Sequence, residues 1–126
     1  MKIEHIGLWV ADLEGMRDFY VTNFNATFGE RYDNVTKGFS SYFMSFPDGQ
    51  TRLEIMTRTD VTTRYPAGHG YAHLAFSVGS HAIVDQMVVD FKVAGIEVVG
   101  EPRTTGDGYY EAVILDPEGN QIELVG

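Results

Sequence analysis

The chain of 126 residues is long enough for one domain-sized core, since 44% of its residues are hydrophobic. Its formal net charge of −9 repels nucleic acid, its first residues do not resemble a signal peptide, and no stretch approaches a membrane span. Because the chain contains no cysteine, it forms no disulfide, any metal must be held by nitrogen and oxygen, and the expected location is a reducing cytoplasm.

The first half of the chain begins with a strand pattern that gives way to a helix pattern. Between residues 3 and 10, the even-numbered apolar residues form one face of a predicted strand, and the other face carries His5, Gly7 and Trp9. Asp12 can cap the following helix, and Asn25 suits its left-handed end. The helix has an apolar stripe of Leu13, Met16, Phe19, Tyr20 and Phe24. Three further strands are predicted at residues 26–32, 38–46 and 52–56.

The second half repeats this plan. A strand at residues 72–78 again alternates, Ser80 can cap a helix, and Gly95 ends it. Strands are predicted at residues 96–100, 108–115 and 121–125. Each half is therefore a βαβββ module, and the fold class is α+β. We predict a single domain of residues 1–126, in which modules 1–56 and 71–126 are joined by a linker at residues 57–70, a segment rich in Thr, Arg, Gly and Pro.

The repeat includes chemistry-bearing residues as well as core residues. Each module opens with a histidine, His5 or His73, and closes with a glutamate, Glu54 or Glu123, that is flanked by apolar residues. Strand alternation turns each carboxylate away from the helix layer and onto the concave face that carries the histidine. Two imidazoles and two carboxylates suit a divalent ion such as Ni, Co, Zn, Mn or Fe. We therefore predict a metal site formed by these four residues.

A second group of residues is predicted to bind a small-molecule substrate beside this metal. Trp9, Phe43 and Tyr109 alternate onto the same face and would line an apolar pocket, unless they serve only in packing. Arg58 and Arg103 would clamp a substrate carboxylate, the alternative being that each is a solvated surface charge.

The chain as a whole resembles the vicinal oxygen chelate superfamily, which includes glyoxalase I, bleomycin-binding proteins and extradiol dioxygenases. The motifs that carry this resemblance are His5-Ile6-Gly7-Leu8-Trp9-Val10, the helix after Asp12, Ala72-His73-Leu74-Ala75-Phe76, and Asp116-Pro117-Glu118-Gly119-Asn120-Gln121-Ile122-Glu123. The resemblance implies that the two modules form a cupped, barrel-like mixed sheet.

Within the superfamily, the order His, Glu, His, Glu resembles glyoxalase I most. That resemblance implies a lyase that acts on the adduct of a 2-oxoaldehyde with a thiol through a metal-bound enediolate. Glu123 would be the catalytic base, and Glu54 would hold the metal or assist. It also implies a homodimer with shared sites, in which the modules of one subunit pair with those of another. The linker length allows this arrangement or closure within one chain.

Two departures from the glyoxalase I pattern lie on the substrate side. Trp9 stands where bacterial glyoxalase I usually has an arginine, and Arg58 stands where it has an asparagine. They predict a different or smaller substrate, a different thiol, or another isomerase-type reaction on the same metal scaffold. The alternative function is a metal-independent drug-binding protein of bleomycin-resistance type, which the acidic charge and the aromatic content favour. An oxygen-activating Fe(II) enzyme is a third reading, which a fourth protein ligand disfavours.

Overall fold

The computed structural model describes residues 1–64 and 68–126. The chain divides into two compact units, Met1–Tyr65 and Pro66–Gly126, and each contains one module. The predicted linker includes residues 65–67, which lie outside the described residues. Among the described helices, neither is long and apolar enough to cross a membrane.

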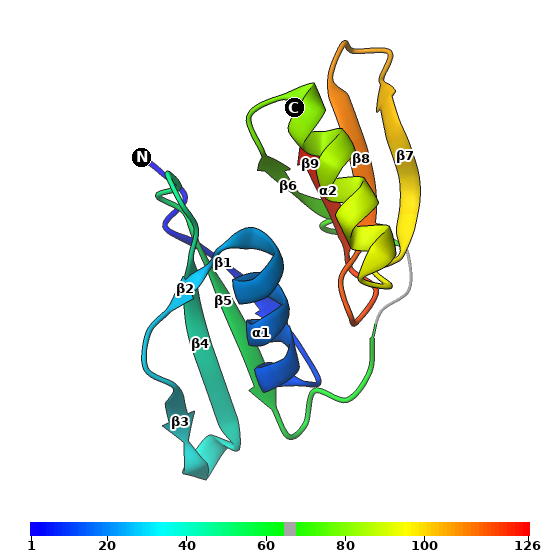
Figure 1. The fold of residues 1–126 in the computed structure, drawn as a ribbon. Helices are drawn as coiled ribbons and strands as arrows, with labels where there is room; N and C mark the ends of the chain where they lie inside the picture. The colour runs from blue at the N-terminus through cyan, green and yellow to red at the C-terminus, as the bar shows by residue number, and fades with distance from the viewer. Residues whose placement is uncertain (65–67) are drawn as a thin grey trace. The chain divides into compact units, whose positions relative to one another are not determined.

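The first unit is a five-stranded mixed sheet with one helix against it (Figure 1). Its elements are β1 (His5–Trp9), α1 (Leu13–Phe24), β2 (Thr27–Phe28), β3 (Tyr32–Asn34), a 3-10 helix (Val35–Lys37), β4 (Phe39–Ser45) and β5 (Arg52–Arg58). The strand order is β1-β5-β4-β2, and β3 also pairs with β4. β1 runs parallel to β5, whereas β2, β3 and β5 run antiparallel to β4.

The second unit repeats the arrangement with four strands. Its elements are β6 (His73–Ser77), α2 (His81–Val93), β7 (Val98–Thr104), β8 (Tyr110–Leu115) and β9 (Gln121–Val125), and the strand order is β6-β9-β8-β7 (Figure 1). β6 is parallel to β9. The predicted α+β class and the two βαβββ modules are confirmed. Each described sheet is open by itself rather than barrel-like, because its two end strands do not pair with each other.

The helix ends follow the sequence signals. The Asp12 carboxylate accepts a hydrogen bond from Gly15 N at 3.0 Å, and Asn25 ends α1 with a φ of 51°. The Ser80 hydroxyl accepts from Ile83 N at 3.3 Å. Gly95, just beyond α2, has a φ of 78°. These caps satisfy backbone groups that a helix end leaves free and thereby set where each helix begins and ends.

One face of each sheet packs under its helix and forms the core of that unit. Met16, Tyr20 and Ile55 are fully buried in the first unit, as are Ile122 and Leu124 in the second. Since side chains alternate along a strand, the residues between these core positions point to the opposite face. That opposite face carries the histidines and glutamates of the repeat.

Several predicted strands have different ends in the structure. The segment 26–32 is interrupted at residues 29–31, which include the exposed Glu30 and Arg31, and is therefore divided between β2 and β3. β5 continues two residues beyond its predicted end because Thr57 and Arg58 pair with β4. β7 starts later and ends later than predicted, and its register with β8 shifts between Gly100 and Arg103.

Candidate functional site

The parallel pairing of β1 with β5 places His5 beside Glu54. His5 lies opposite Arg52 in the register, and Glu54 lies opposite Gly7. This register brings the side chains of His5 and Glu54 to neighbouring positions on the same face of the sheet. Nε2 of His5 lies 3.8 Å from Oε2 of Glu54. The Glu54 side chain is only 16% exposed, so most of it is shielded from solvent.

The second module places its histidine and glutamate in the same register. His73 lies opposite Gln121 in the pairing of β6 with β9, and Glu123 lies opposite the small residue Ala75. Nε2 of His73 lies 3.2 Å from Oε2 of Glu123, whose side chain is 18% exposed. The sequence repeat therefore corresponds to a repeated structural pair of one imidazole and one carboxylate, each pair within one unit.

The chemistry of each pair fits a divalent metal ion. Adjacent ligands at about 2.1 Å from such an ion lie about 3.0–3.4 Å from each other. The separation of 3.2 Å in the second pair lies within this range, whereas that of 3.8 Å in the first pair is wider. A single pair supplies only two of the ligands that an ion needs. Among the described residues, no group of three or more His, Asp or Glu side chains forms a candidate site.

A third polar side chain contacts the histidine of the first module. Oε2 of Glu4 lies 2.5 Å from Nδ1 of His5, and Glu4 also accepts a hydrogen bond from Arg52. These hydrogen bonds, that from His5 first, lower the pKa of the Glu4 carboxyl below its ordinary value. Glu4 therefore stays ionised at neutral pH.

The predicted substrate residues of the first unit form an aromatic and cationic face. Phe43 lies opposite Glu54 in the register, and its ring meets the His5 ring edge-on at 5.3 Å. Trp9 packs edge-on against Phe39 at 6.1 Å. Arg58 lies over the Trp9 ring at 5.0 Å, and its Nε donates to Asp60 at 2.5 Å. Arg58 is thus partly engaged by an aromatic ring and a carboxylate.

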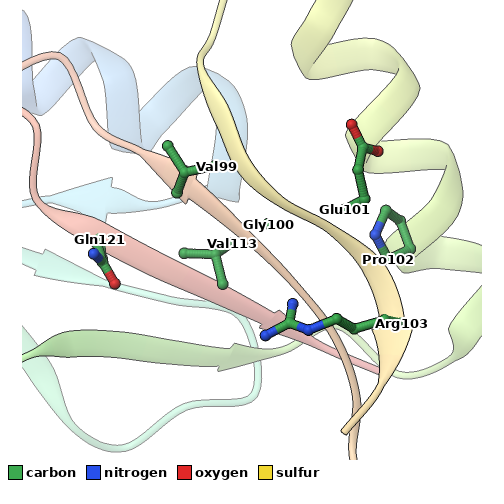
Figure 2. A pocket seen from close by; sticks show the side chains of 7 residues that line it. All are labelled: Val99, Gly100, Glu101, Pro102, Arg103, Val113 and Gln121. Atoms are coloured by element: carbon green, nitrogen blue, oxygen red, sulfur yellow. The ribbon is translucent and has the colours of Figure 1, made fainter.

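An open hollow of about 440 Å³ lies on the face of the second sheet that carries His73 and Glu123. Its polar and small lining includes Gly100, Arg103 and Gln121, together with Val113, which pairs with Glu123. Figure 2 shows the Arg103 guanidinium reaching over the sheet below Val113. Nη2 of Arg103 lies 3.3 Å from Oε1 of Glu111, and within residues 1–64 and 68–126 this is its one carboxylate partner, so other N–H groups of the guanidinium remain for a ligand.

Tyr109 is not brought into this hollow. It is 58% exposed and lies between the turn at residues 106–107 and the start of β8, where its carbonyl oxygen accepts a hydrogen bond from Thr105 N. Strand alternation predicted that Tyr109, like Phe43, faces the substrate. Alternation holds only within a strand, however, and β8 begins one residue later, at Tyr110.

The sequence interpretation missed several residues on these faces. Arg52 and Gln121 each lie two residues before the glutamate of their strand, so the period of two would have placed them beside it. Phe39, four residues before Phe43 on β4, was detectable by the same rule. Gly100 could not be found in this way, because it lies where the register of β7 with β8 shifts.

Comparison with known protein families identifies one superfamily that matches almost the whole chain. The family model of the Glyoxalase/Bleomycin resistance protein/Dioxygenase superfamily matches residues 2–124. The uncharacterized protein YqjT of Bacillus subtilis is 29% identical over 130 residues, which cover 98% of this chain and 97% of YqjT.

Solved structures show the same fold. The trypanothione-dependent glyoxalase I of Leishmania major has a TM-score of 0.80 at 22% identity, covering 100% of this chain and 86% of that protein. A glyoxalase family protein from Enterococcus faecalis has a TM-score of 0.80 at 23% identity, covering 99% and 97%. At these identities the likeness concerns the fold alone.

Proposed function

Because the chain belongs to the Glyoxalase/Bleomycin resistance protein/Dioxygenase superfamily, we propose that it is a metal-dependent lyase or isomerase of glyoxalase I type. The observation that carries this proposal is the His–Glu pair that recurs in the same register in both modules. Packing alone does not require an imidazole and a mostly buried carboxylate at matching places of both sheets.

The four residues of the two pairs would hold the ion: His5, Glu54, His73 and Glu123. A divalent metal supplies a Lewis acid that favours negative charge on the oxygens of a substrate. In glyoxalase-type proteins the modules pair between subunits, and we extend that arrangement to this chain as a homodimer with shared sites. The first-module pair of one subunit would then complete the second-module pair of the other.

Glu123 would move the proton, and Glu54 would mainly hold the metal. A carboxylate acts as a general base when it lies within reach of a C–H bond whose carbon is next to a carbonyl group. Such a bond is present in the adduct of a 2-oxoaldehyde with a thiol. Trp9 and Phe43 would bound the apolar side of the substrate, Arg58 and Arg103 would face its acidic groups, and Tyr109 would lie at the rim.

The direct test is an assay of the purified protein, reconstituted with Ni, Co, Zn or Mn, on methylglyoxal with several thiols. We expect turnover with at least one thiol and loss of turnover after chelation. His5→Ala should sharply reduce the metal retained, as measured by elemental analysis. Wild-type protein that retains none of these metals would rule out the proposal.

A second candidate is a drug-binding protein of bleomycin-resistance type. It is favoured by the net charge of −9 and by the aromatic side chains on the first sheet, which together suit a cationic aromatic ligand. Tight binding of such a ligand that persists after chelation would support this function over catalysis.

A further inference from the structure

A closed ring of contacts surrounds His5. Nδ1 of His5 lies 2.5 Å from Oε2 of Glu4, whose other carboxylate oxygen accepts a hydrogen bond from Nη2 of Arg52. The Arg52 guanidinium lies over the Phe43 ring at 4.2 Å, and that ring meets the His5 ring edge-on at 5.3 Å. His5 is therefore held from two sides, and only its Nε2 faces Glu54.

The contact with Glu4 determines which nitrogen of His5 carries the proton. An ionised carboxylate accepts hydrogen bonds and donates none, so Nδ1 must be the protonated nitrogen. In the neutral imidazole this leaves the lone pair on Nε2, so Nε2, the nitrogen that faces Glu54, is the one that can bind a metal. We propose that Glu4, anchored by Arg52, is a positioning residue that fixes the tautomer and orientation of His5 as a metal ligand. This inference rests on the function proposed above.

Backbone pairing holds Glu4 in place even though its side chain is more than half exposed. Arg52 N donates to the carbonyl oxygen of Glu4 at 3.0 Å, and the Thr51 hydroxyl donates to the carbonyl oxygen of Ile3 at 3.0 Å. The chain just before β1 is therefore tied to the chain just before β5. Glu4 and Arg52 are brought together by the same parallel register that places His5 beside Glu54.

The second module provides an internal comparison. Ala72 precedes His73 where Glu4 precedes His5, and Gln121 lies opposite His73 where Arg52 lies opposite His5. The two histidines are therefore inequivalent: only His5 has an adjacent carboxylate that is itself anchored by a cation. We expect His5 to be preorganised for one metal-binding nitrogen, and His73 to select its tautomer when the metal binds.

The variants that test this inference follow from the comparison. Glu4→Ala and Arg52→Gln give the first module the residues of the second. Glu4→Gln keeps an oxygen that can accept from Nδ1 and should rescue the tautomer. Glu30→Ala removes the same charge from an exposed position of the same unit and serves as the control.

The first measurement is the imidazole ¹⁵N spectrum of metal-free full-length protein, at a pH where histidine is neutral. We expect His5 to be protonated at Nδ1 in the wild type and in Glu4→Gln, and to show mixed tautomers in Glu4→Ala. Arg52→Gln should lie between them. A His5 spectrum that is identical in the wild type and in Glu4→Ala overturns the inference.

The second measurement is the affinity for zinc and for nickel alone, by calorimetric titration. Loss of such an outer carboxylate should weaken binding about 10–100-fold, and Glu30→Ala should bind as the wild type does. Equal affinity in the wild type and Glu4→Ala overturns the positioning role. A wild type that binds neither metal overturns the proposed function instead, while the tautomer measurement still tests the hold of Glu4 on His5.

Discussion

Replacing Asp116 should destabilise the second unit through the turn that leads into β9. Asp116 is 4% exposed, and its carboxylate accepts three hydrogen bonds, from Glu118 N at 2.9 Å and from Asn120 N and Nδ2 at 2.8 Å each. This turn joins β8 to β9 and so sets where Glu123 enters the sheet. Asp116→Ala leaves these donors without their acceptor.

The expected loss can be worked from these contacts. A hydrogen bond to a charged group contributes about 1.5–3 kcal/mol, but water can replace part of the set once the side chain is removed. Removing the carboxylate also relieves the cost of burying it. We therefore expect Asp116→Ala to lower the free energy of unfolding by about 2–4 kcal/mol.

Urea unfolding at neutral pH, followed by circular dichroism, measures this loss. Asp48→Asn is the matched control, since Asp48 is an exposed carboxylate in the corresponding turn of the first unit. Its φ of 58° suits asparagine equally well, so little change is expected. If Asp116→Ala unfolds at the same urea concentration as the wild type, the carboxylate does not hold the turn and the reasoning is wrong.

The pH dependence gives a second check on Asp116. Burial, as the largest cause, raises the pKa of its carboxyl above the ordinary value of 3.8. A raised pKa in the folded state means that the stabilising contribution is fully present below the ordinary pKa and is lost as pH rises through the folded pKa. The stability of wild type relative to Asp116→Asn should therefore fall as pH increases above about 4. A relative stability that rises over this range would contradict the assigned cause.

Three further predictions concern the core, the proton transfer and the hollow. Ile55→Ala, at a fully buried position under α1, should cost about 2–5 kcal/mol in urea unfolding, whereas a loss below 1 kcal/mol would mean that this core is loosely packed. Glu123→Gln keeps an oxygen ligand but cannot take a proton, so kcat in the methylglyoxal assay should fall about 10²–10⁴-fold while elemental analysis still finds the metal. An unchanged kcat would assign the proton transfer elsewhere. Arg103→Gln should raise KM for an acidic substrate with little effect on kcat, and an unchanged KM would exclude the guanidinium from substrate binding.

Much of the fold follows from local chemistry and was predictable. The alternation around His5 and His73 separates a core face from a polar face because successive strand residues point in opposite directions. Asp12 and Ser80 start the helices because their side chains satisfy free backbone N–H groups within three residues. These signals act over a few residues, so they can be read without knowing which strands are neighbours.

The sequence repeat also allowed a prediction about residues that are far apart in the chain. A histidine and a glutamate near opposite ends of one module are uninformative alone, but their recurrence indicated that they belong together. The structure confirms that His5 lies beside Glu54, and His73 beside Glu123. That the four hold a metal stays a prediction.

Only the tertiary structure decided how the paired strands align, and therefore which side chains reach the histidines. The register of β1 on β5 brings Arg52 and Glu4 to His5, and no local pattern specifies a pairing between strands so far apart in the chain. The extension of β5 to Arg58 and the shift at Gly100 likewise depend on partner strands. Composition and periodicity determined the two modules and the faces of their strands, because these are properties of one segment. The ring around His5 and the hollow beside Glu123 depend on long-range hydrogen bonding, which only the folded sheets define.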